Sequence, residues 1–422
     1  MPRTRGVTLR RTNSMVTLPI DLLTREALQN PHPIFTWLRE NDPVHWSERH
    51  HSWIVTRYDD VAELFFRPEI SSDRVRPLIG KAKSATAESD ELLKMIGEWM
   101  VVTDPPAHTR LRQLVTPAFR PARIAMLEAQ IHAITDDLID KFIASGETDF
   151  IKHVAFQLPA AVISDLLGAP YSDRDLFKTW SDDLALIAFG AGADIRDDRY
   201  TKARAALDDM SEYFQGLIEL RRREPKEDLI STLVHSESTL DEPLNDAEIK
   251  SMCALILFAG HETTTNLMAT FVGTILPRED QYRKLVADPS LMKTAVEEVL
   301  RYDGSIKILH RWVLDDFPLH DVTIKKGDRV LLCLSSANRD PRKFDRPEEV
   351  DITRHPNPHM AFGKGIHTCI GAQLSRIEAR IALEKVFTRL PNMKLVKDEL
   401  EWVPILSARG LKELHITHEA RK

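Results

Sequence analysis

Residues 361–371 read Ala-Phe-Gly-Lys-Gly-Ile-His-Thr-Cys-Ile-Gly, and they carry the most specific motif in the chain. Its three glycines allow a tight turn and let a flat ligand approach the backbone closely. An amphipathic helix is predicted directly behind it, over 371–390, so Cys369 lies at the start of a helix, where the pKa of a thiol falls and the thiolate is favoured. A glycine-rich turn with an incidental cysteine would explain a Gly-x-Gly fragment but not the whole string.

The string matches F-G-x-G-x-H-x-C-x-G at every fixed position, and it therefore resembles the haem-binding loop of the cytochrome P450 family. The resemblance implies haem b as the cofactor, with the Cys369 thiolate as the proximal ligand of the iron. It also implies that Phe362 packs beside the thiolate and that His367 binds a haem propionate. Gly363 and Gly371 are the loop glycines expected to contact the cofactor.

The composition is that of an ordinary globular protein. Of 422 residues, 43% are hydrophobic and 29% charged, and 57 Lys+Arg against 64 Asp+Glu give a net charge of −7. A mildly acidic chain argues against a dedicated nucleic-acid binder, which needs a basic surface. Three cysteines are too few for a disulfide scaffold and fit a cytoplasmic setting, and Cys253 and Cys333 are predicted to be buried. Because no run of about 18 apolar residues is present, we expect no membrane anchor.

The pattern along the chain predicts a mainly α protein with a smaller β part. Residues 1–15 are expected to form a flexible basic arm, and 16–422 a single domain. Helices are expected over 121–145, 202–222, 246–276 and 371–390. Strands are expected near 44–56, 306–313 and 319–334, with one hairpin over 322–330 and another over 402–418. We interpret residues 67–105 as a long functional loop and residues 170–200 as a mobile helix–loop–helix.

The longest predicted helix, 246–276, is apolar all round in its first half, so it should run through the centre of the molecule. Residues 259–266, Ala-Gly-His-Glu-Thr-Thr-Thr-Asn, then interrupt the apolar pattern. Their hydroxyls can bond the i−4 carbonyl, and we expect a local opening of the helix here. A helix that emerges into solvent is the alternative, but the apolar pattern resumes after residue 266.

This polar segment resembles the family's oxygen-activation motif, [A/G]-G-x-[D/E]-T-[T/S]. The resemblance implies that Glu262 is the acid and Thr263 the hydroxyl of a proton relay to the oxygen-binding side of the haem. It places Ala259 beside the cofactor. A buried site needs such a positioned proton donor, whereas an enzyme that depends on hydrogen peroxide can dispense with it.

The sequence Glu298-Val299-Leu300-Arg301 matches the family's E-x-x-R motif, with both charged side chains on one helix face. Together with Arg354, the resemblance implies the family's Glu-Arg-Arg structural network. For E-x-x-R taken alone, the alternative is a solvated surface ion pair worth under about 1 kcal/mol.

The two propionates of a haem need cationic or hydrogen-bonding partners. His108 and Arg112 are four residues apart and share one face of a predicted helix. The resemblance implies that both bind a propionate, together with Arg311 on the following strand and His367. For His108 alone, a surface histidine is the alternative.

The resemblance places the substrate pocket beside the long helix and the strand after Arg301. Candidate lining residues are Leu255, Phe258, Ala259, Thr263, Ile306 and Ile308. They imply an apolar, medium-to-large substrate, with ordinary core packing as an equal interpretation. Many family members have proline after Arg-Tyr-x-x, where this chain has Ser305. Lys307 is expected to face solvent, with contact to an acidic substrate group as the alternative.

The resemblance implies a bacterial-type haem-thiolate monooxygenase that inserts one oxygen atom from O2 into an organic substrate, by hydroxylation or epoxidation. Electrons from NAD(P)H would arrive through a separate ferredoxin or flavodoxin and its reductase, because the residues after Cys369 are too few for a redox module. Candidates for a basic docking face are Arg110, Arg112, Arg120, Lys364 and Arg376. The chain is expected to be a monomer. The alternatives are a haem-thiolate peroxygenase or isomerase without external electrons, and a non-catalytic haem carrier or sensor.

Overall fold

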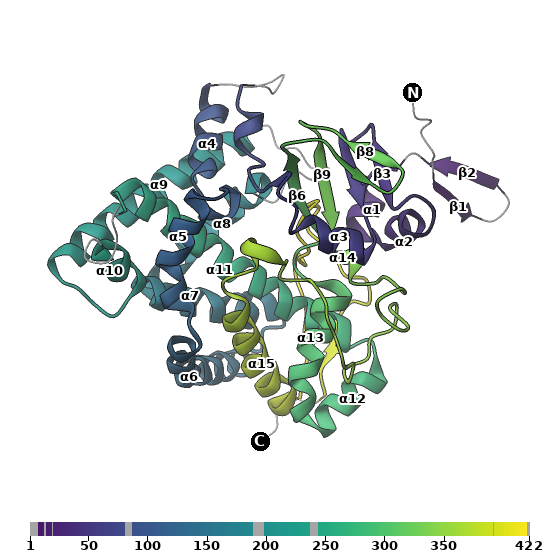
Figure 1. Ribbon diagram of the computed structural model, residues 1–422. Coiled ribbons are helices and arrows are strands. Elements are labelled where there is room, and N and C mark those ends of the chain that lie inside the picture. The colour runs from purple at the N-terminus through teal and green to yellow at the C-terminus, as the bar shows by residue number, and fades with distance from the viewer. Residues whose placement is uncertain are drawn as a thin grey trace.

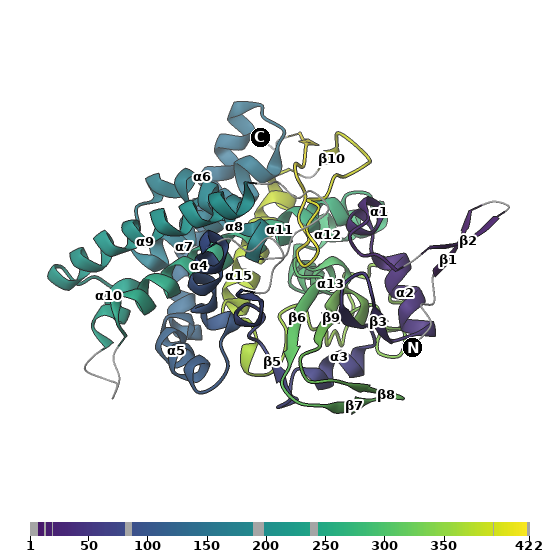
Figure 2. The same cartoon turned by 90° about the horizontal axis from the view of Figure 1, so that it is seen from above.

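The computed structural model describes residues 7–11, 14–18, 20–80, 87–188, 198–236, 244–390 and 392–419. Helices dominate these residues and strands form a smaller part, which confirms the predicted fold class. Figure 1 shows most helices on one side of the molecule and the largest sheet on the other, with α11 (Asp246–Ile275) between them. Figure 2 shows the same division from above.

The helical part contains every long helix that the sequence predicts. The helices are α1 (Arg25–Gln29), α2 (His32–Asn41), α3 (Tyr58–Leu64), α4 (Ala87–Gly97), α5 (Ala107–Val115), α6 (Pro121–Ser145), α7 (Gln157–Leu167), α8 (Arg174–Ala188), α9 (Arg199–Arg223), α10 (Leu229–Val234), α11, α12 (Glu279–Ala287), α13 (Met292–Asp303), α14 (Leu334–Ala337) and α15 (Ala372–Arg389). Short helical turns are η1 (Arg76–Leu78), η2 (Met100–Val102), η3 (Thr116–Phe119), η4 (Ile151–Ala155), η5 (Tyr171–Asp173), η7 (Pro289–Leu291) and η8 (Gly365–His367).

The β part is built around one five-stranded sheet of order β3-β4-β9-β6-β5. The strands are β1 (Val7–Arg11), β2 (Ser14–Leu18), β3 (Val44–Ser47), β4 (Ser52–Val55), β5 (Ile70–Ser71), β6 (Ile308–Val313), β7 (Phe317–Leu319), β8 (Val322–Ile324), β9 (Arg329–Cys333), β10 (Lys394–Leu395) and β11 (Ile416–Thr417). β6 pairs antiparallel with β9, with Arg311 opposite Val330, and β4 pairs parallel with β9.

Helix α11 is fixed at its start by a capping box. The Asn245 side chain accepts a hydrogen bond from the Glu248 amide, and the Glu248 carboxylate accepts one from the Asn245 amide, both at 3.0 Å. The first half of α11 packs in one hydrophobic cluster with α4, α8 and α9, and the second half in another with α6, α13 and α15. The polar segment 259–266 therefore lies where the two hydrophobic clusters meet.

The expected opening of α11 is wrong, because the helix runs without a break through 259–266. A Cβ at Gly260 would lie 2.5 Å from the Cδ1 atom of Ile163 on α7. The glycine therefore allows α7 and α11 to pack closely, rather than loosening α11. The hydroxyls of Thr263 and Thr264 do bond the carbonyls four residues earlier, at 3.1 and 3.4 Å, as the sequence predicts.

The interpretation of 67–105 as one long loop is also wrong. The segment contains β5 and the helix α4, which the prolines on either side conceal in the sequence. Leu92 and Ile96 lie four residues apart on α4 and are buried against the cluster that includes α9 and α11. Tertiary burial of this short apolar face explains the helix.

The hairpin predicted over 322–330 is replaced by another pairing. β8 pairs with β7, not with β9, because β9 is buried on both faces and occupies the centre of the sheet between β4 and β6. The hairpin predicted in 402–418 is confirmed in its first part, where Trp402 pairs antiparallel with Leu411 and the Val403 amide donates to the Gly410 carbonyl at 2.8 Å. The end of that segment, β11, pairs instead with β10. The strand pairs near 44–56 and at 306–313 agree with prediction.

The N-terminal segment predicted as a loose arm contains β1 and β2, which pair antiparallel from Val7 opposite Leu18. The helix–loop–helix predicted for 170–200 contains α8, and its residues 189–197 lie outside the described residues. Among the helices that the structure describes, none is long and apolar enough to cross a membrane.

Candidate active site

The loop before α15 is closed by hydrogen bonds within itself. The Cys369 amide donates to the Phe362 carbonyl and the Gly363 amide to the Met360 carbonyl, both at 2.9 Å. Gly363 and Gly365 both have φ of +69°, a conformation that favours glycine. A Cβ at Gly365 would lie 2.8 Å from the Phe65 carbonyl oxygen. These constraints hold the loop in one shape and place Cys369 just before α15.

Cys369 lies deep in the protein, yet its side chain is accessible to a ligand. Burial raises the pKa of the Cys369 thiol, while the Gly371 amide and the charges of Arg112 and Arg376 lower it. The start of the helix lowers the thiol pKa through the Gly371 amide, as predicted, but burial has the larger effect, so the net direction is upward. A coordinating metal deprotonates a thiol outright, so iron binding would still give the thiolate.

Four groups predicted to hold propionates come together beside this loop. His108 on α5 and His367 in the loop have ring centroids 4.0 Å apart. Arg112 donates to the Thr368 carbonyl at 2.7 Å, and Arg311 on β6 donates to the carbonyl of His310 at 2.8 Å. Among the described residues, neither ring nitrogen of His108 has a hydrogen-bond partner, and no carboxylate pairs with Arg112 or Arg311.

Burial and mutual repulsion act on this group of side chains together. Burial, then the charge of Arg74, lowers the pKa of Arg311 to about 9. Burial, then His108 and the three nearby arginines, lowers the pKa of His367 to about 3. Buried cations without an anion are costly, so a ligand with two carboxylates would stabilise them. A Cβ at Gly371 would meet nothing within 4 Å, which leaves room for a flat ligand at the loop. These residues fit a haem.

Arg74 also belongs to this cationic group, although it was not predicted from the sequence. It follows β5, whose pairing with β6 brings the segment beside Arg311. Its guanidinium donates one long hydrogen bond, 3.5 Å, to the Val101 carbonyl, and burial lowers its pKa to about 10. No local motif marks Arg74, since its place depends on strand pairing with a segment more than 200 residues away.

The acid and hydroxyl of the predicted relay lie on neighbouring positions of α11. Burial raises the pKa of Glu262, and nearby Asp182 raises it further. The Glu262 carboxylate accepts a hydrogen bond from Asn266 at 3.2 Å, and the Thr263 hydroxyl donates to the Ala259 carbonyl at 3.1 Å. Ala259 is exposed in the midst of the otherwise buried helix. A carboxyl group that keeps its proton in a buried site can act as a proton donor.

A hydrogen bond connects this segment to the helix that starts at the cysteine loop. Thr264 lies next to Thr263 on α11, and its hydroxyl donates to the Ser375 hydroxyl on α15 at 3.1 Å. Ser375 lies in the second turn after Cys369, and its amide donates to the Gly371 carbonyl at 2.9 Å. The polar segment of α11 therefore lies close to the start of α15.

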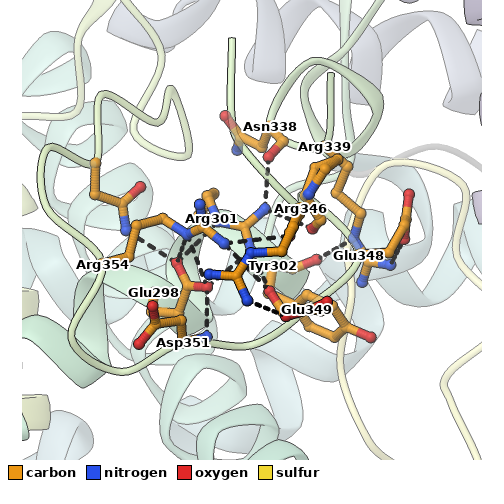
Figure 3. A network of polar contacts seen from close by, with 12 residues as sticks. Glu298, Arg301, Tyr302, Asn338, Arg339, Arg346, Glu348, Glu349, Asp351 and Arg354 are labelled. Carbon is orange, nitrogen blue, oxygen red and sulfur yellow. Dashed lines mark hydrogen bonds and ion pairs between the residues drawn. The ribbon is translucent and has the colours of Figure 1, made fainter. Parts of the chain in front are cut away.

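Glu298 joins two arginines in a buried network (Figure 3). Arg301 donates to both oxygens of Glu298 at 2.8 Å, and Arg354 donates to them at 3.1 and 3.0 Å. Arg301 also donates to the carbonyls of Asn338, Pro347 and Glu349. The network ties α13 to the segment that leads into the cysteine loop, so the contacts expected among the three residues are present.

The predicted pocket residues do not all share one surface. Leu255 and Phe258 are buried in the cluster of the first half of α11, where Phe258 packs on Trp99 with ring centroids 5.8 Å apart. Ile306 is half-buried and forms a bridge with Ala408. Ile308 is 1% exposed and packs with Ile54 in a cluster that, among described residues, contains none from α11. Ile308 was therefore wrongly assigned to the pocket, because it lies on the strand face that packs against the N-terminal segment.

Lys307 does not face solvent as expected. It is 2% exposed, and its ammonium donates to the Ile405 carbonyl at 2.9 Å. Burial lowers its pKa to about 7. The nearby Asp303 is paired with Arg409 rather than with Lys307. Lys307 thus joins the start of β6 to the segment 403–410.

Two of the five cations predicted to form a docking face are paired within the chain. Arg110 pairs with Glu248 at the start of α11, and Arg376 pairs with Glu297 on α13. Arg376 also lies 4.4 Å from the centre of the Phe362 ring, so it packs on the cysteine loop. The predicted basic face is therefore weaker than a count of charges indicates.

Comparison with known proteins agrees with this site. The family model described as cytochrome P450 matches residues 20–287 and 272–391. The chain is 35% identical to the polyketide biosynthesis cytochrome P450 PksS of Bacillus subtilis, over 93% of this chain and 97% of that protein. It is 36% identical to a vitamin D(3) 25-hydroxylase of Pseudonocardia autotrophica, over 94% of this chain and 96% of that protein.

Solved structures share the architecture. The structure of P450BioI in complex with hexadec-9Z-enoic acid ligated acyl carrier protein aligns with a TM-score of 0.85 and 32% identity. The alignment covers 93% of this chain and 99% of that one. Cytochromes P450 bind haem b through a cysteine thiolate, and relatives of this chain are named as monooxygenases. The motifs, the site and the comparisons agree that this chain belongs to the cytochrome P450 family.

Proposed function

We propose that this enzyme inserts one oxygen atom from O2 into an apolar, medium-to-large organic substrate. The observation that carries the proposal is the hydrogen bond from Thr264 to Ser375, which brings the polar segment of α11 close to the start of α15. This contact supports a proton relay on α11 that would lie near the thiol that would bind the iron. A carrier or sensor of haem has no use for this arrangement.

The bound haem would supply the redox chemistry, and the chain would hold it and move protons. Cys369 would ligate the iron. His108, Arg112, Arg311 and His367 would bind the propionates, with Arg74 as a further cation beside them. Glu262 would hold a proton in the buried site, and the Thr263 hydroxyl would pass it toward the oxygen-binding side.

The substrate class rests on the apolar residues of α11 and on the relatives. Leu255 and Phe258 give the first half of α11 an apolar surface. The relatives include a polyketide-biosynthesis enzyme, a vitamin D(3) 25-hydroxylase and a protein bound to an acylated carrier protein. These names support large, mostly apolar molecules such as polyketides, steroids or fatty acids.

Electrons would arrive from NAD(P)H through a ferredoxin or flavodoxin with its reductase. Arg112, Arg120 and Lys364 are the members of the predicted docking face for which no ion pair occurs among the described residues, and Arg112 is also assigned to a propionate. Three free cysteines fit a reducing compartment, so we place the enzyme in the cytoplasm, as a monomer.

The test is a carbon monoxide difference spectrum of the reduced, freshly purified protein. A thiolate ligand gives the red-shifted Soret band of the family, and Cys369→Ser should abolish this band. Cys333→Ala is the control, because Cys333 is buried in the sheet and should leave the band in place. A Soret band at the wavelength of histidine-ligated haem in the unmodified protein would refute the assignment. Product formation that requires NAD(P)H then separates a monooxygenase from a peroxygenase or isomerase.

A further inference from the structure

Ser305 makes a direct contact with the proton-donating segment of α11. Its hydroxyl donates to the Thr263 carbonyl at 2.7 Å, and the Ser305 side chain is buried. The carbonyl of Ser305 accepts the amide of Arg409 at 2.8 Å. Ser305 lies in the connection from α13 to β6. It therefore links α11 to the segment 403–410.

The contact depends on the residue type at this position. Serine has a hydroxyl donor, and proline, which the family often has here, has none. Gly304 has φ of −65° and ψ of 157°, which is also the conformation required before proline. The conformation of Gly304 is thus compatible with either residue at 305, and the hydrogen bond to Thr263 depends on the serine of this chain.

The hydroxyl acts on a carbonyl inside a continuous helix. In an α-helix the Thr263 carbonyl accepts the amide four residues later, and its second lone pair is free for Ser305. The next residue, Thr264, is held by a hydrogen bond to Ser375 of α15. The turn that carries Glu262 and Thr263 is therefore fixed by contacts with two serine hydroxyls.

We propose that Ser305 is a positioning residue that holds Thr263 in place for proton transfer. The inference rests on the proposed function. In the productive reaction, substrate R–H, O2, two electrons and two protons give R–OH and water. If the proton is delivered to the wrong place, O2, two electrons and two protons give hydrogen peroxide and the substrate is unchanged. Both electrons come from NAD(P)H through the electron donors in either case.

The test compares hydroxyl-containing with hydroxyl-free variants of the haem-loaded enzyme. The probe is carbon monoxide on the reduced protein, whose C–O stretching band responds to the groups around Thr263 and needs no substrate. We expect S305A and S305P to shift the band toward its position in T263A, while S305T keeps the position of the unmodified enzyme. The two hydroxyl-free variants differ in backbone stiffness, so one remains informative if the other does not fold.

The matched control is S407A. Ser407 is a buried serine in the neighbouring segment, and its hydroxyl bonds His310 at 2.8 Å and not α11. S407A should therefore leave the band unchanged. With myristic acid and a surrogate ferredoxin and reductase, loss of one hydrogen bond should raise the ratio of hydrogen peroxide to product about fivefold in S305A.

The outcomes separate the two proposals. An unchanged band and ratio in both S305A and S305P, with T263A clearly altered, would overturn the role of Ser305 alone. A T263A enzyme identical to the unmodified enzyme would refute the relay through Thr263, and with it the positioning role. A carbon monoxide spectrum without the thiolate signature would instead refute the proposed function itself.

Discussion

Glu298 and Arg301 form a two-point ion pair from which water is fully excluded. Each side chain is 0% exposed, and the guanidinium donates to both carboxylate oxygens at 2.8 Å. Removal of one partner leaves the other charge buried without compensation, which costs about 3–5 kcal/mol. The intact Glu298–Arg301 pair is therefore needed for the stability of the fold around the cysteine loop, whatever reaction the enzyme catalyses.

The first prediction is that E298Q strongly lowers the free energy of unfolding. The neutral amide cannot balance Arg301 and Arg354, so the loss should be about 3–5 kcal/mol by urea denaturation at neutral pH. E349Q is the matched control, because Glu349 pairs with Arg346 at the surface with 60% exposure on both sides. It should cost under about 1 kcal/mol. Equal effects of the two variants would contradict a buried network.

The second prediction concerns retention of haem. R311M removes a buried cation that, among described residues, has no carboxylate partner, and this cation is assigned to a propionate. A charge-assisted hydrogen bond is worth about 1.5–3 kcal/mol, so haem should transfer to apomyoglobin about ten- to a hundredfold faster. R74M should act in the same direction.

The control for haem retention is R76M, which lies on the same segment as Arg74. Arg76 is 42% exposed and pairs with Asp73 and Glu98 at the surface. R76M should release haem at the rate of the unmodified protein. If R311M retains haem as well as R76M does, the propionate assignment of Arg311 is wrong.

The sequence alone was sufficient where function depends on residues close together in the chain. The cysteine loop, the capped helix α11 and the E-x-x-R pair are local patterns, and the structure places them as expected. Helix α6 has the predicted bounds because its apolar face repeats over many turns.

Failures occurred where distant segments decide the environment of a residue. The segment 403–410 covers Lys307 and buries it, and the sequence near residue 307 does not predict this burial. β8 does not pair with β9, because β4, more than 250 residues earlier in the chain, pairs with β9. Arg74 and Ser305 were missed for the same reason, since their partners lie on β6 and α11.

The third prediction is that K307M changes how stability depends on pH. Burial lowers the pKa of Lys307 from 10.5 to about 7, so between these values the unfolded chain binds a proton that the folded chain does not. The contribution of Lys307 to the free energy of unfolding therefore falls as pH decreases from 10.5 to 7. Methionine removes this dependence, and the stability of K307M relative to the unmodified protein should rise as pH decreases across this range. K325M, at a surface pair with Asp316, should show a flat difference.

The fourth prediction uses a buried acid on α15. Burial raises the pKa of Glu378 from 4.5 to about 8, and its Oε2 atom has no hydrogen-bond partner among described residues. Between these pH values the unfolded chain is ionised and the folded chain protonated, so stability is lost as pH rises from 4.5 to 8. E378Q should become more stable, relative to the unmodified protein, from pH 5 to pH 8 in urea titrations. E384Q on the exposed side of the same helix should not show this trend.

The last prediction tests Glu262 as the proton donor. E262Q keeps the shape of the side chain and can still accept the hydrogen bond from Asn266, but it has no proton to give. Loss of general acid catalysis should lower turnover about a hundredfold. Because burial raises the pKa of Glu262, turnover of the unmodified enzyme should decline as pH rises through that pKa, whereas E262Q should lack this decline. Turnover is measured as product formed across pH with saturating electron donors.

The control variant N266A keeps the carboxyl group of Glu262 and should retain the pH-dependent decline. If E262Q matches the unmodified enzyme in both rate and pH profile, the proton reaches Thr263 by a route that does not include Glu262.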